Sequence, residues 1–357
     1  MRIVQVCPTY YPQVGGIGEQ VRNTSERLAK KHDMVVLTTD ASGTLPTVES
    51  INGVEVKRYK SWAPNEAYYF SWKLRECLLK KRVNYDVLHA HGYGAFPALY
   101  ASQVKNGGRF VFSPHYHGSG HSFFRSLLHV PYKFLGKGIF KKSDRIICVS
   151  NFERNLIKSH FKIDEKKFVV IPNGINFEEF IGLGRRNVPK RDSRVVLYVG
   201  RLEKYKGVQY LITVLRKLDE STLLEIVGTG PYKKDLIRLA HEQGIEARVR
   251  FYENLPREEL LQRYADADVF VLLSRHEAYG ISVAEALASG IPCIVLKASA
   301  LQEWVDNKDV FGIDYPIDLD ELASIIKTNI GKKIERTDLC TWDMVAEDLE
   351  RIYEELQ

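Results

Sequence analysis

The sequence predicts an α/β protein built from two Rossmann-like domains in tandem, with a cleft between them. Its 357 residues are enough for two domains with sizeable cores. Short apolar runs alternate with helical patterns through the first half, as in βα units around a mostly parallel sheet. A second series of the same kind begins after the polar, basic stretch 184–193. We therefore place the N-terminal domain at residues 1–175 and the C-terminal domain at residues 176–340.

Six strands are predicted in the first domain, each a short run rich in apolar and β-branched residues. They lie at residues 3–6, 34–38, 87–89, 109–112, 145–149 and 169–171. Because helical patterns separate them, we expect neighbouring strands to run parallel. The carboxyl ends of these strands then meet at one edge of the sheet, where open α/β sheets bind ligands.

Five strands are predicted in the second domain, at residues 195–199, 223–227, 249–251, 269–273 and 292–296. A helix over residues 283–288 follows the fourth of these strands and ends at Gly290. Apolar side chains recur with helical period over residues 342–356, which predicts an amphipathic helix there.

The composition indicates a folded protein without a nucleic-acid partner. Hydrophobic residues make up 45% and charged residues 27%, with a net charge of +6. This small excess is compatible with an anionic substrate or a membrane surface, but it does not indicate nucleic acid. The scattered cysteines predict free thiols in a reducing compartment: Cys7, Cys77, Cys148, Cys293 and Cys340. Since no signal peptide or membrane span is visible, we predict a cytoplasmic protein.

Two glutamates, Glu277 and Glu285, stand eight positions apart around the pair Tyr279 and Gly280. Two interpretations are open from this segment alone. Glu285 can cap the predicted helix, because Ser282-x-x-Glu285 fits a capping box and a carboxylate in the first turn favours the helix dipole. Alternatively, both glutamates belong to a site, since a loop between a strand's carboxyl end and a helix start suits anionic ligands.

A glycine-rich stretch after the first strand invites a dinucleotide interpretation, because Gly16-x-Gly18 is followed by Asp40 at the end of the next strand. Two features argue against NAD. Val21 occupies the position of the third glycine, and residues 7–15 separate the strand from the glycines, where the fingerprint would turn at once. The glycines still leave backbone N–H groups at a helix start open to a phosphate.

Two further glycine loops follow strands of the second domain. Residues 200–207 supply Arg201, Lys204 and Lys206, with Gly207 opening a helix. Arginine offers a forked contact to phosphate and lysine a point charge, although a solvated charged loop is the alternative. Together with residues 228–231, the three glycine loops can face one anionic ligand.

Metal binding is a further possibility, which we do not favour. The pairs His89 with His91 and His115 with His117 are expected after strands of the first domain, but no carboxylate lies at ligand spacing. Two Asp-x-Asp pairs are expected to be structural, because one precedes its strand and the other sits where a helix cap belongs. They are Asp266 with Asp268 and Asp318 with Asp320.

With these motifs in hand, the chain resembles the retaining GT-B glycosyltransferases of the family 4 type, which use nucleotide sugars. The likeness runs nearly end to end, and its motifs include Gly200-Arg-Leu-x-x-x-Lys-Gly207 and Glu277-x7-Glu285. The other matching segments are residues 11–16, 86–92, 143–150, 171–175 and 265–274. The resemblance implies a GT-B fold, with two Rossmann-like domains facing a central cleft and the C-terminal helix, residues 341–357, crossing back to the N-terminal domain.

The resemblance also implies roles for individual residues. Arg201 and Lys206 would hold the donor diphosphate, and Gly16 would bring first-domain backbone to it. Glu285 would bind the ribose hydroxyls. Glu277 and the amides around Tyr279 and Gly280 would meet the sugar and the distal phosphate. His115 would contact the transferred sugar near the acceptor, with His117 as the alternative.

The implied reaction moves a sugar from a nucleoside diphosphate sugar to a carbohydrate, lipid-linked or small-molecule acceptor, by front-face displacement and without a metal or other cofactor. An epimerase or phosphorylase on the same fold, and a non-catalytic nucleotide-sugar binding protein, are the alternatives. The chain departs from the family pattern at residues 297–303 and at Glu253, which predicts altered contacts near the phosphate and the base.

A basic, aromatic segment raises a separate possibility. Residues 122–142 combine five basic side chains with several aromatics and no acidic residue. Such a mixture can bind anionic lipid, which would give a peripheral membrane contact at the inner membrane face. The alternative is a helix packed on the first domain.

Overall fold

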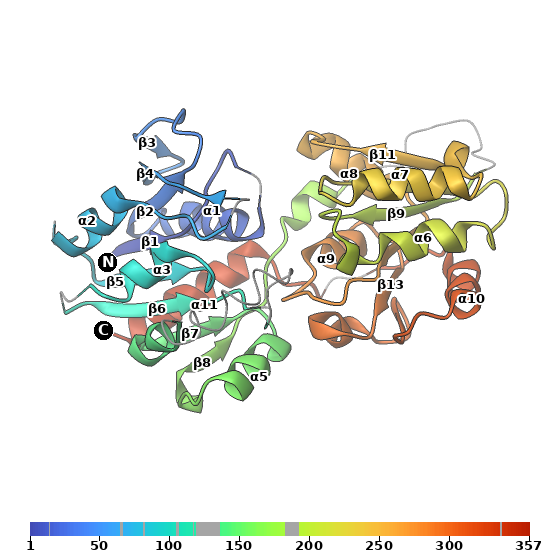
Figure 1. Ribbon diagram of the computed structural model, residues 1–357. Helices are drawn as coiled ribbons and strands as arrows, with labels where there is room; N and C mark the ends of the chain where they lie inside the picture. The colour runs from blue at the N-terminus through green and yellow to red at the C-terminus, as the bar shows by residue number, and fades with distance from the viewer. Residues whose placement is uncertain are drawn as a thin grey trace. The chain divides into compact units, whose positions relative to one another are not determined.

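A computed structural model describes residues 1–13, 15–64, 67–80, 83–104, 107–116, 118, 136–182, 193–335 and 338–357. The chain divides into two compact units (Figure 1). Unit 1 comprises Met1–Gly174 together with Cys340–Gln357, and unit 2 comprises Ile175–Leu339. Each unit has its own sheet and its own hydrophobic core.

Unit 1 contains an eight-stranded sheet in the order β3-β4-β2-β1-β5-β6-β7-β8. All neighbouring strands are parallel except β3 and β4. The strands are β1 (Arg2–Val6), β2 (Asp33–Asp40), β3 (Val48–Ile51), β4 (Val54–Lys60), β5 (Val87–His91), β6 (Arg109–Ser113), β7 (Arg145–Cys148) and β8 (Phe168–Val170). The six predicted strands are present, and the hairpin of β3 and β4 was missed.

The helices of unit 1 are α1 (Gly16–Leu28), α2 (Trp72–Lys80), α3 (Phe96–Ala101), α5 (Asn151–His160) and α11 (Trp342–Glu355). Residues 136–142 are also helical. The remainder of the basic segment 122–142 and residue His117 lie outside the described residues, as does most of the stretch 184–193.

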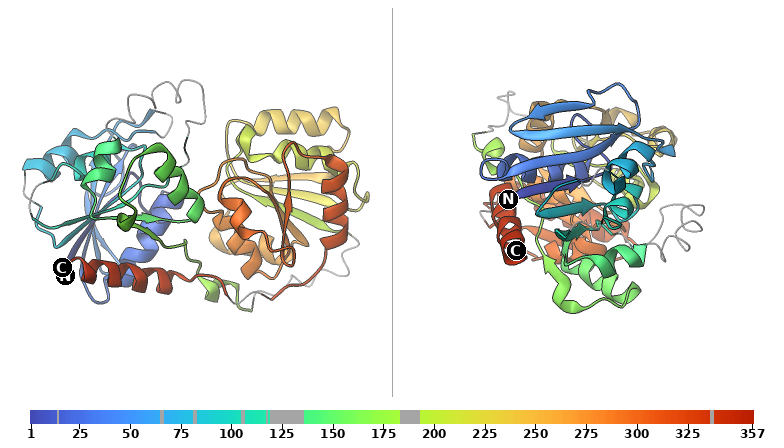
Figure 2. Two further views of the ribbon diagram at one scale, coloured as in Figure 1. Left: turned by 90° about the horizontal axis from the view of Figure 1, so that it is seen from below. Right: turned by 90° about the vertical axis from the view of Figure 1, so that its left-hand side faces the viewer.

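The C-terminal helix α11 belongs to unit 1, where it lies along α1 (Figure 2). Ion pairs join Arg27 to Asp343 at 3.0 Å and Lys31 to Glu350 at 2.8 Å. On its inner face, the buried Tyr353 hydroxyl hydrogen-bonds Nδ1 of His89 at 2.6 Å. The return of this helix to the first domain is therefore as expected.

Unit 2 contains a six-stranded, fully parallel sheet in the order β11-β10-β9-β12-β13-β14. The strands are β9 (Val195–Val199), β10 (Leu223–Val227), β11 (Val249–Tyr252), β12 (Val269–Leu272), β13 (Cys293–Leu296) and β14 (Val310–Ile313). The helices are α6 (Val208–Leu215), α7 (Lys233–Glu242), α8 (Arg257–Asp266), α9 (Ile281–Ala288) and α10 (Leu319–Asn329). The two Rossmann-like sheets predicted from the sequence are confirmed.

The order of strands in unit 2 reverses at its middle, because the chain first builds outward from β9 through β10 to β11 and then returns to the other side of β9 with β12. Parallel α/β sheets bind ligands beyond the carboxyl ends of the strands at such a switch point. The loops that follow β9 and β12 are therefore the natural location for a site in this unit.

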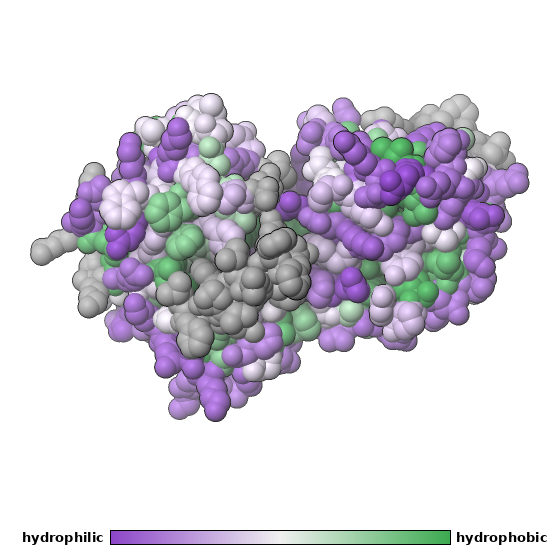
Figure 3. All heavy atoms as spheres, in the orientation of Figure 1, coloured by the Kyte–Doolittle hydropathy of each residue, from purple (hydrophilic) through white to green (hydrophobic). Residues whose placement is uncertain are grey.

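In the view of Figure 3, hydrophilic side chains cover much of unit 2, with smaller apolar patches between them. Among the described residues, none of the helices is long and apolar enough to span a membrane. All five cysteines are free thiols, as predicted.

Candidate functional site

The loop after β9, residues 200–207, is held against the glycine loop after β10. Gly200 donates its N–H to the Val227 carbonyl at 3.0 Å, and Leu202 donates to the Thr229 carbonyl at 2.8 Å. A Cβ added to Gly228 would lie 1.9 Å from the carbonyl oxygen of Gly200, so only glycine permits this approach. Two of the three predicted glycine loops therefore form one surface; the third belongs to unit 1.

Lys206 and Glu277 form an ion pair between the loops that follow β9 and β12. Lys206 Nζ lies 2.5 Å from Glu277 Oε1, and the two side chains are only 13% and 15% exposed. Burial pulls the pKa of Lys206 down, but the Glu277 carboxylate and neighbouring Tyr205 outweigh it, and the net pKa lies above its ordinary value. The structure thus places a permanent, preoriented cation at the switch point.

Arg201, the second predicted phosphate ligand, has a more open environment. Its guanidinium is 50% exposed and lies 3.6 Å from Glu203. Its carbonyl oxygen accepts a hydrogen bond from the buried Tyr198 hydroxyl at 2.9 Å, which fixes the backbone at this position. About half of the side chain is therefore open to an incoming anion.

The loop after β12 is fixed by contacts that the sequence did not reveal. Glu277 donates its backbone N–H to Ser299 Oγ at 3.0 Å, and Trp304 Nε1 donates to the Tyr279 carbonyl at 2.7 Å. Gly280 caps α9 with φ of +95°, and a Cβ there would lie 2.8 Å from Leu301. These contacts present the start of α9, the positive end of its dipole, beside the Glu277 loop.

The capping-box interpretation of Glu285 is wrong. Helix α9 begins at Ile281 rather than at 283, so Glu285 lies in the second turn, and Ser282 is already inside the helix. The N-cap is Gly280, and no side chain caps this helix. The expected first-turn interaction with the dipole is therefore lost as well, because that effect falls off beyond the first turn.

Glu285 instead accepts two hydrogen bonds from α8. Arg257 donates to Oε1 at 2.6 Å, and the buried Tyr264 hydroxyl donates to Oε2 at 2.9 Å. Arg257 also pairs with Glu179 at 2.7 Å. Sequence reasoning missed Arg257 and Tyr264, since no local pattern distinguishes them from other residues of an amphipathic helix. They hold the Glu285 carboxylate in one orientation.

In unit 1, His115 follows β6 with φ of +50°, an uncommon conformation for a residue with a side chain. Its ring stacks on His91 at a centroid distance of 6.0 Å, and the His91 ring lies tilted against that of His89, with their centroids 4.2 Å apart. His89 and His91 lie within β5 rather than after it, contrary to the prediction. Burial lowers the pKa of His89 to about 3, and that of His91 falls for the same reason. Both rings are neutral at ordinary pH.

A buried carboxylate, Glu153, shapes the loop that carries His115. Its Oε1 accepts the backbone N–H of Tyr116 at 2.6 Å, and its Oε2 accepts that of Val149 at 2.8 Å. Glu153 is fully buried, and burial raises its pKa to about 7 against the lowering effect of these two N–H groups. No local pattern in the sequence distinguishes Glu153 from other residues of its helix.

Gly16 is the first residue of α1, with Gly15 as its N-cap. Within the described part of the chain, an added Cβ at Gly16 would meet no atom within 4 Å, whereas one at Gly18 would lie 3.2 Å from the Thr9 carbonyl. Close packing against Thr9 therefore explains why residue 18 is a glycine, whereas contacts within the described residues do not explain the glycine at 16. The predicted role of Gly16 toward a diphosphate stays a prediction.

The Asp-x-Asp pairs have structural roles, as predicted. Asp268 accepts from Arg194 at 3.0 Å and from the Val195 N–H at 2.8 Å, in front of β12. Asp318 caps α10 by accepting from the N–H groups of Asp320 and Glu321. Across the described ranges, no three histidine, cysteine, aspartate or glutamate side chains gather as a metal site would require.

Comparison with known families places both halves of the chain in one enzyme class. Residues 14–179 match the family described as Glycosyltransferase Family 4, and residues 184–338 match Glycosyl transferases group 1. An uncharacterised glycosyltransferase of Methanocaldococcus jannaschii is 28% identical, over 99% of this chain and 98% of that protein. A glycogen synthase of Mycobacterium tuberculosis is 31% identical, over 92% of this chain and 86% of that protein.

Solved structures share the fold over its whole length. Sucrose-phosphate synthase from Thermosynechococcus elongatus has a TM-score of 0.84 at 22% identity, covering 100% of this chain and 99% of its own. Anabaena HepE, solved in complex with UDP and glucose, has a TM-score of 0.77 at 15% identity, covering 100% of both chains. These likenesses confirm the predicted GT-B fold.

Proposed function

Since the chain belongs to the family 4 type of GT-B glycosyltransferases, we propose that it transfers a hexose from a nucleoside diphosphate sugar with retention at the anomeric carbon. The acceptor is a carbohydrate, a lipid-linked molecule or a small molecule. The observation that carries the proposal is the buried pair of Lys206 and Glu277 beside the start of α9. A cation and a helix amino terminus in one place suit the diphosphate of such a donor.

In the proposed complex, the diphosphate binds Lys206, Arg201 and the backbone amides around Tyr279 and Gly280. When the diphosphate binds, its negative charge takes over part of the role of Glu277 as the partner of Lys206. The Glu277 carboxylate can then accept hydrogen bonds from sugar hydroxyls. Glu285, already oriented by Arg257 and Tyr264, accepts from the ribose hydroxyls.

The proposed chemistry is a front-face displacement. The bond between the anomeric carbon and the diphosphate oxygen breaks, and the acceptor oxygen bonds to the same face of that carbon. The acceptor proton passes to the departing diphosphate. Lys206, Arg201 and the α9 amino terminus stabilise the charge that grows on the leaving group, and His115 contacts the transferred sugar.

We further propose that no divalent metal takes part. The fixed groups at the switch point supply the positive charge that a metal ion provides in other enzymes. Activity should survive EDTA at full rate. Loss of activity on chelation that is restored by magnesium or manganese would contradict this part of the proposal.

The first experiment identifies the donor. UDP-glucose, ADP-glucose and GDP-mannose are compared by thermal shift, because a ligand that binds only the folded state raises apparent stability. The stabilising donor is then incubated with and without sugar acceptors, and the products are separated. Transfer with retention supports the proposal. An epimerised donor, phosphorolysis, or binding without any turnover would replace it with one of the alternatives on the same fold.

Single substitutions test the assigned roles. Lys206→Ala should cost on the order of 2–4 kcal/mol of transition-state stabilisation, the range for losing one preorganised donor. Lys217→Ala, an exposed lysine paired with Asp320, is the matched control and should leave the rate unchanged. His115→Ala should lower turnover far more than donor affinity, because its contact matters most near the transition state. An equal loss in both quantities would remove His115 from that role.

A further inference from the structure

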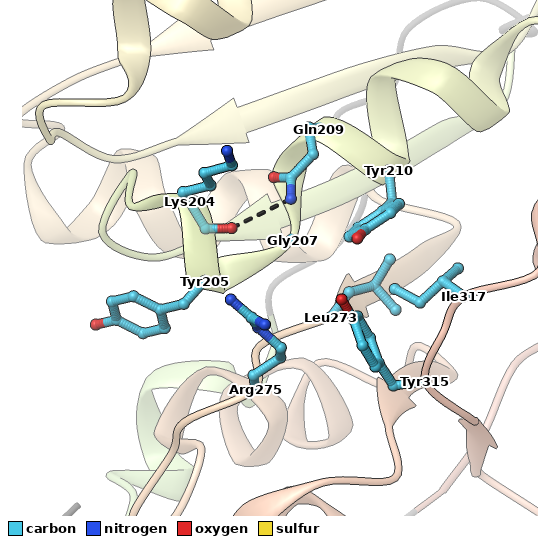
Figure 4. A pocket seen from close by; sticks show the side chains of 9 residues that line it. All are labelled: Lys204, Tyr205, Gly207, Gln209, Tyr210, Leu273, Arg275, Tyr315 and Ile317. Atoms are coloured by element: carbon cyan, nitrogen blue, oxygen red, sulfur yellow. Dashed lines mark hydrogen bonds between the residues drawn. The ribbon is translucent and has the colours of Figure 1, made fainter. Parts of the chain in front are cut away.

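A cavity lies in unit 2, apart from the pair of Lys206 and Glu277. Its volume is about 220 Å³, and it lies among the loop before α6, the start of α6, the end of β12 and the segment after β14. Figure 4 shows the side chains around it, which include Tyr205, Gln209, Tyr210, Arg275 and Tyr315. Neither Lys206 nor Glu277 lines it.

The lining carries positive charge and no negative charge. Lys204 and Arg275 contribute the cations, and no aspartate or glutamate is among the lining residues. Arg275 lies over the ring of Tyr315, 5.6 Å from its centroid, and Figure 4 shows its guanidinium between Tyr205 and Tyr315. Neither cation forms an ion pair with a carboxylate in the described part of the chain. Both side chains are exposed, so they are available to an incoming anionic group.

The remaining lining suits a sugar ring. Three tyrosines surround the space, with apolar support from Leu273 and Ile317. Their rings can pack on the apolar faces of a sugar while their hydroxyls bond to its hydroxyl groups. The amide of Gln209 adds a further polar contact. Its Nε2 donates to the Lys204 carbonyl at 3.2 Å, while its buried Oε1 has no hydrogen-bond partner among the described residues.

We propose that this cavity binds a monosaccharide that carries an anionic group, either a phosphate or a carboxylate. The volume is below the range of about 300–1,000 Å³ typical of drug-sized ligands, which favours one sugar unit over a nucleotide. A neutral sugar would make no use of the charge of Arg275, and a bare phosphate would make no use of the tyrosine rings. This ligand is additional to the donor, because the donor ligands Lys206 and Glu277 lie outside the cavity.

The cavity and the donor site share one short loop. Lys204 and Tyr205 face the cavity, whereas the next residue, Lys206, pairs with Glu277. The backbone N–H of Arg275 donates to the Tyr205 carbonyl at 3.0 Å, which joins this loop to the segment leading to Glu277. The two sites are thus adjacent but chemically separate.

The test measures binding of glucose 6-phosphate, glucuronate, glucose and inorganic phosphate by titration calorimetry on the full chain. Glucose 6-phosphate or glucuronate should bind at least about tenfold more tightly than glucose and than inorganic phosphate. The comparison of the two acidic sugars identifies the anionic group. If neither binds at about 10 mM, or if inorganic phosphate binds as tightly, the proposal fails.

Substitutions locate the binding. Arg275→Ala should weaken the acidic sugar at least about tenfold, while Tyr210→Phe should weaken it less, by loss of one neutral hydrogen bond. Arg238→Ala, an exposed arginine on α7, is the matched control and should change nothing. Thermal shift with the donor that the first experiment identifies reports that each variant is folded and that its donor site is intact. Binding that is unaffected by Arg275→Ala would place the sugar elsewhere and overturn the proposal.

Discussion

At the scale of single residues, three carboxylates of this protein differ because of their surroundings. Glu277 lies against Lys206, and Glu285 lies against Arg257, so each has a cation within hydrogen-bond distance. Among the described residues, the Glu153 carboxylate accepts from two backbone N–H groups, and burial outweighs them to raise its pKa to about 7. The charge of Glu153 should therefore respond to pH near neutrality.

The raised pKa of Glu153 predicts a pH-dependent stability. Its ordinary value is 4.5, so the folded protein binds the proton more tightly than the unfolded chain does. The free energy of unfolding should therefore fall, by on the order of 3 kcal/mol, as the pH rises from about 4.5 to about 7. Glu153→Gln removes the titrating group, and this part of the slope should disappear. Urea unfolding at several pH values between 5 and 8 measures it.

A control separates this effect from general charge changes. Glu242→Gln removes an exposed carboxylate on α7 and should leave the slope as in the unsubstituted protein. The same slope in Glu153→Gln would mean that another group is responsible. Because Tyr116 follows His115, Glu153→Gln should also shift the pH profile of turnover if His115 acts in the reaction; a purely structural Glu153 would leave that profile unchanged.

At the scale of elements, the loops after β9 and β12 depend on close backbone approach. Gly207 caps α6 with φ of +80°, and a Cβ there would lie 2.4 Å from the Leu273 carbonyl oxygen. Gly244 has a similar φ of +67° but meets no described atom within 4 Å of an added Cβ. A side chain at either position would therefore be strained by the positive φ. Of the two, Gly207 alone would also bring its Cβ into collision with the Leu273 carbonyl.

This pair yields a prediction about the donor site; here and below, UDP stands for the nucleoside diphosphate of the donor that the first experiment identifies. Gly244→Ala should cost about 1 kcal/mol of stability and leave UDP affinity unchanged. Gly207→Ala should cost more, and it should weaken UDP at least about tenfold because the loop that carries Lys206 must move away from β12. Unfolding by urea and titration with UDP measure the two quantities. Equal effects of the two substitutions would show that the approach to Leu273 is not what holds the loop.

Much of the fold followed from the sequence, because strand patterns are local. The exceptions are also physical. The β3–β4 hairpin carries the turn signal Asn52-Gly53, but its exposed edge strand lacks an apolar run, so it was missed. Strand β14 was also missed, because it is short and contains Gly312. The start of α9 was misplaced by two residues, because Gly280 rather than a polar side chain caps it.

The candidate site could be predicted only in part, since residue types are local but their pairings are not. Lys206 and Glu277 were each identified, yet nothing in a single sequence shows that side chains 71 positions apart form one ion pair. Arg257 and Ser299 gave no signal at all, because their roles depend on which helix or loop lies beside them in the fold.

At the scale of the whole molecule, the two hydrophobic cores are separate, although the chain passes from unit 1 to unit 2 and back. The core of unit 2 contains no residue after Leu339, and α11 contributes its buried side chains to unit 1. The chain leaves unit 1 at Gly174 and returns to it at Cys340. These two points are close together, because a Cβ added to Gly174 would lie 2.4 Å from the Trp342 backbone nitrogen. The stability of unit 1 is therefore tied to the last residues of the chain.

This division predicts separate responses to changes in α11 and to the donor nucleotide. Truncation after Leu339 deletes α11. Unit 1 then loses four buried side chains and should be strongly destabilised: Val345, Leu349, Ile352 and Tyr353. Tyr353→Phe is the milder variant: it leaves the buried Nδ1 of His89 without its partner and should cost about 1–3 kcal/mol.

UDP should still bind both proteins with less than about a tenfold loss of affinity, because the groups proposed to hold its diphosphate lie mainly in unit 2. Calorimetric unfolding with and without UDP measures both effects, since UDP should raise only the transition of unit 2. If Tyr353→Phe abolished UDP binding while unit 1 unfolded as before, the assignment of the diphosphate-binding groups mainly to unit 2 would be wrong.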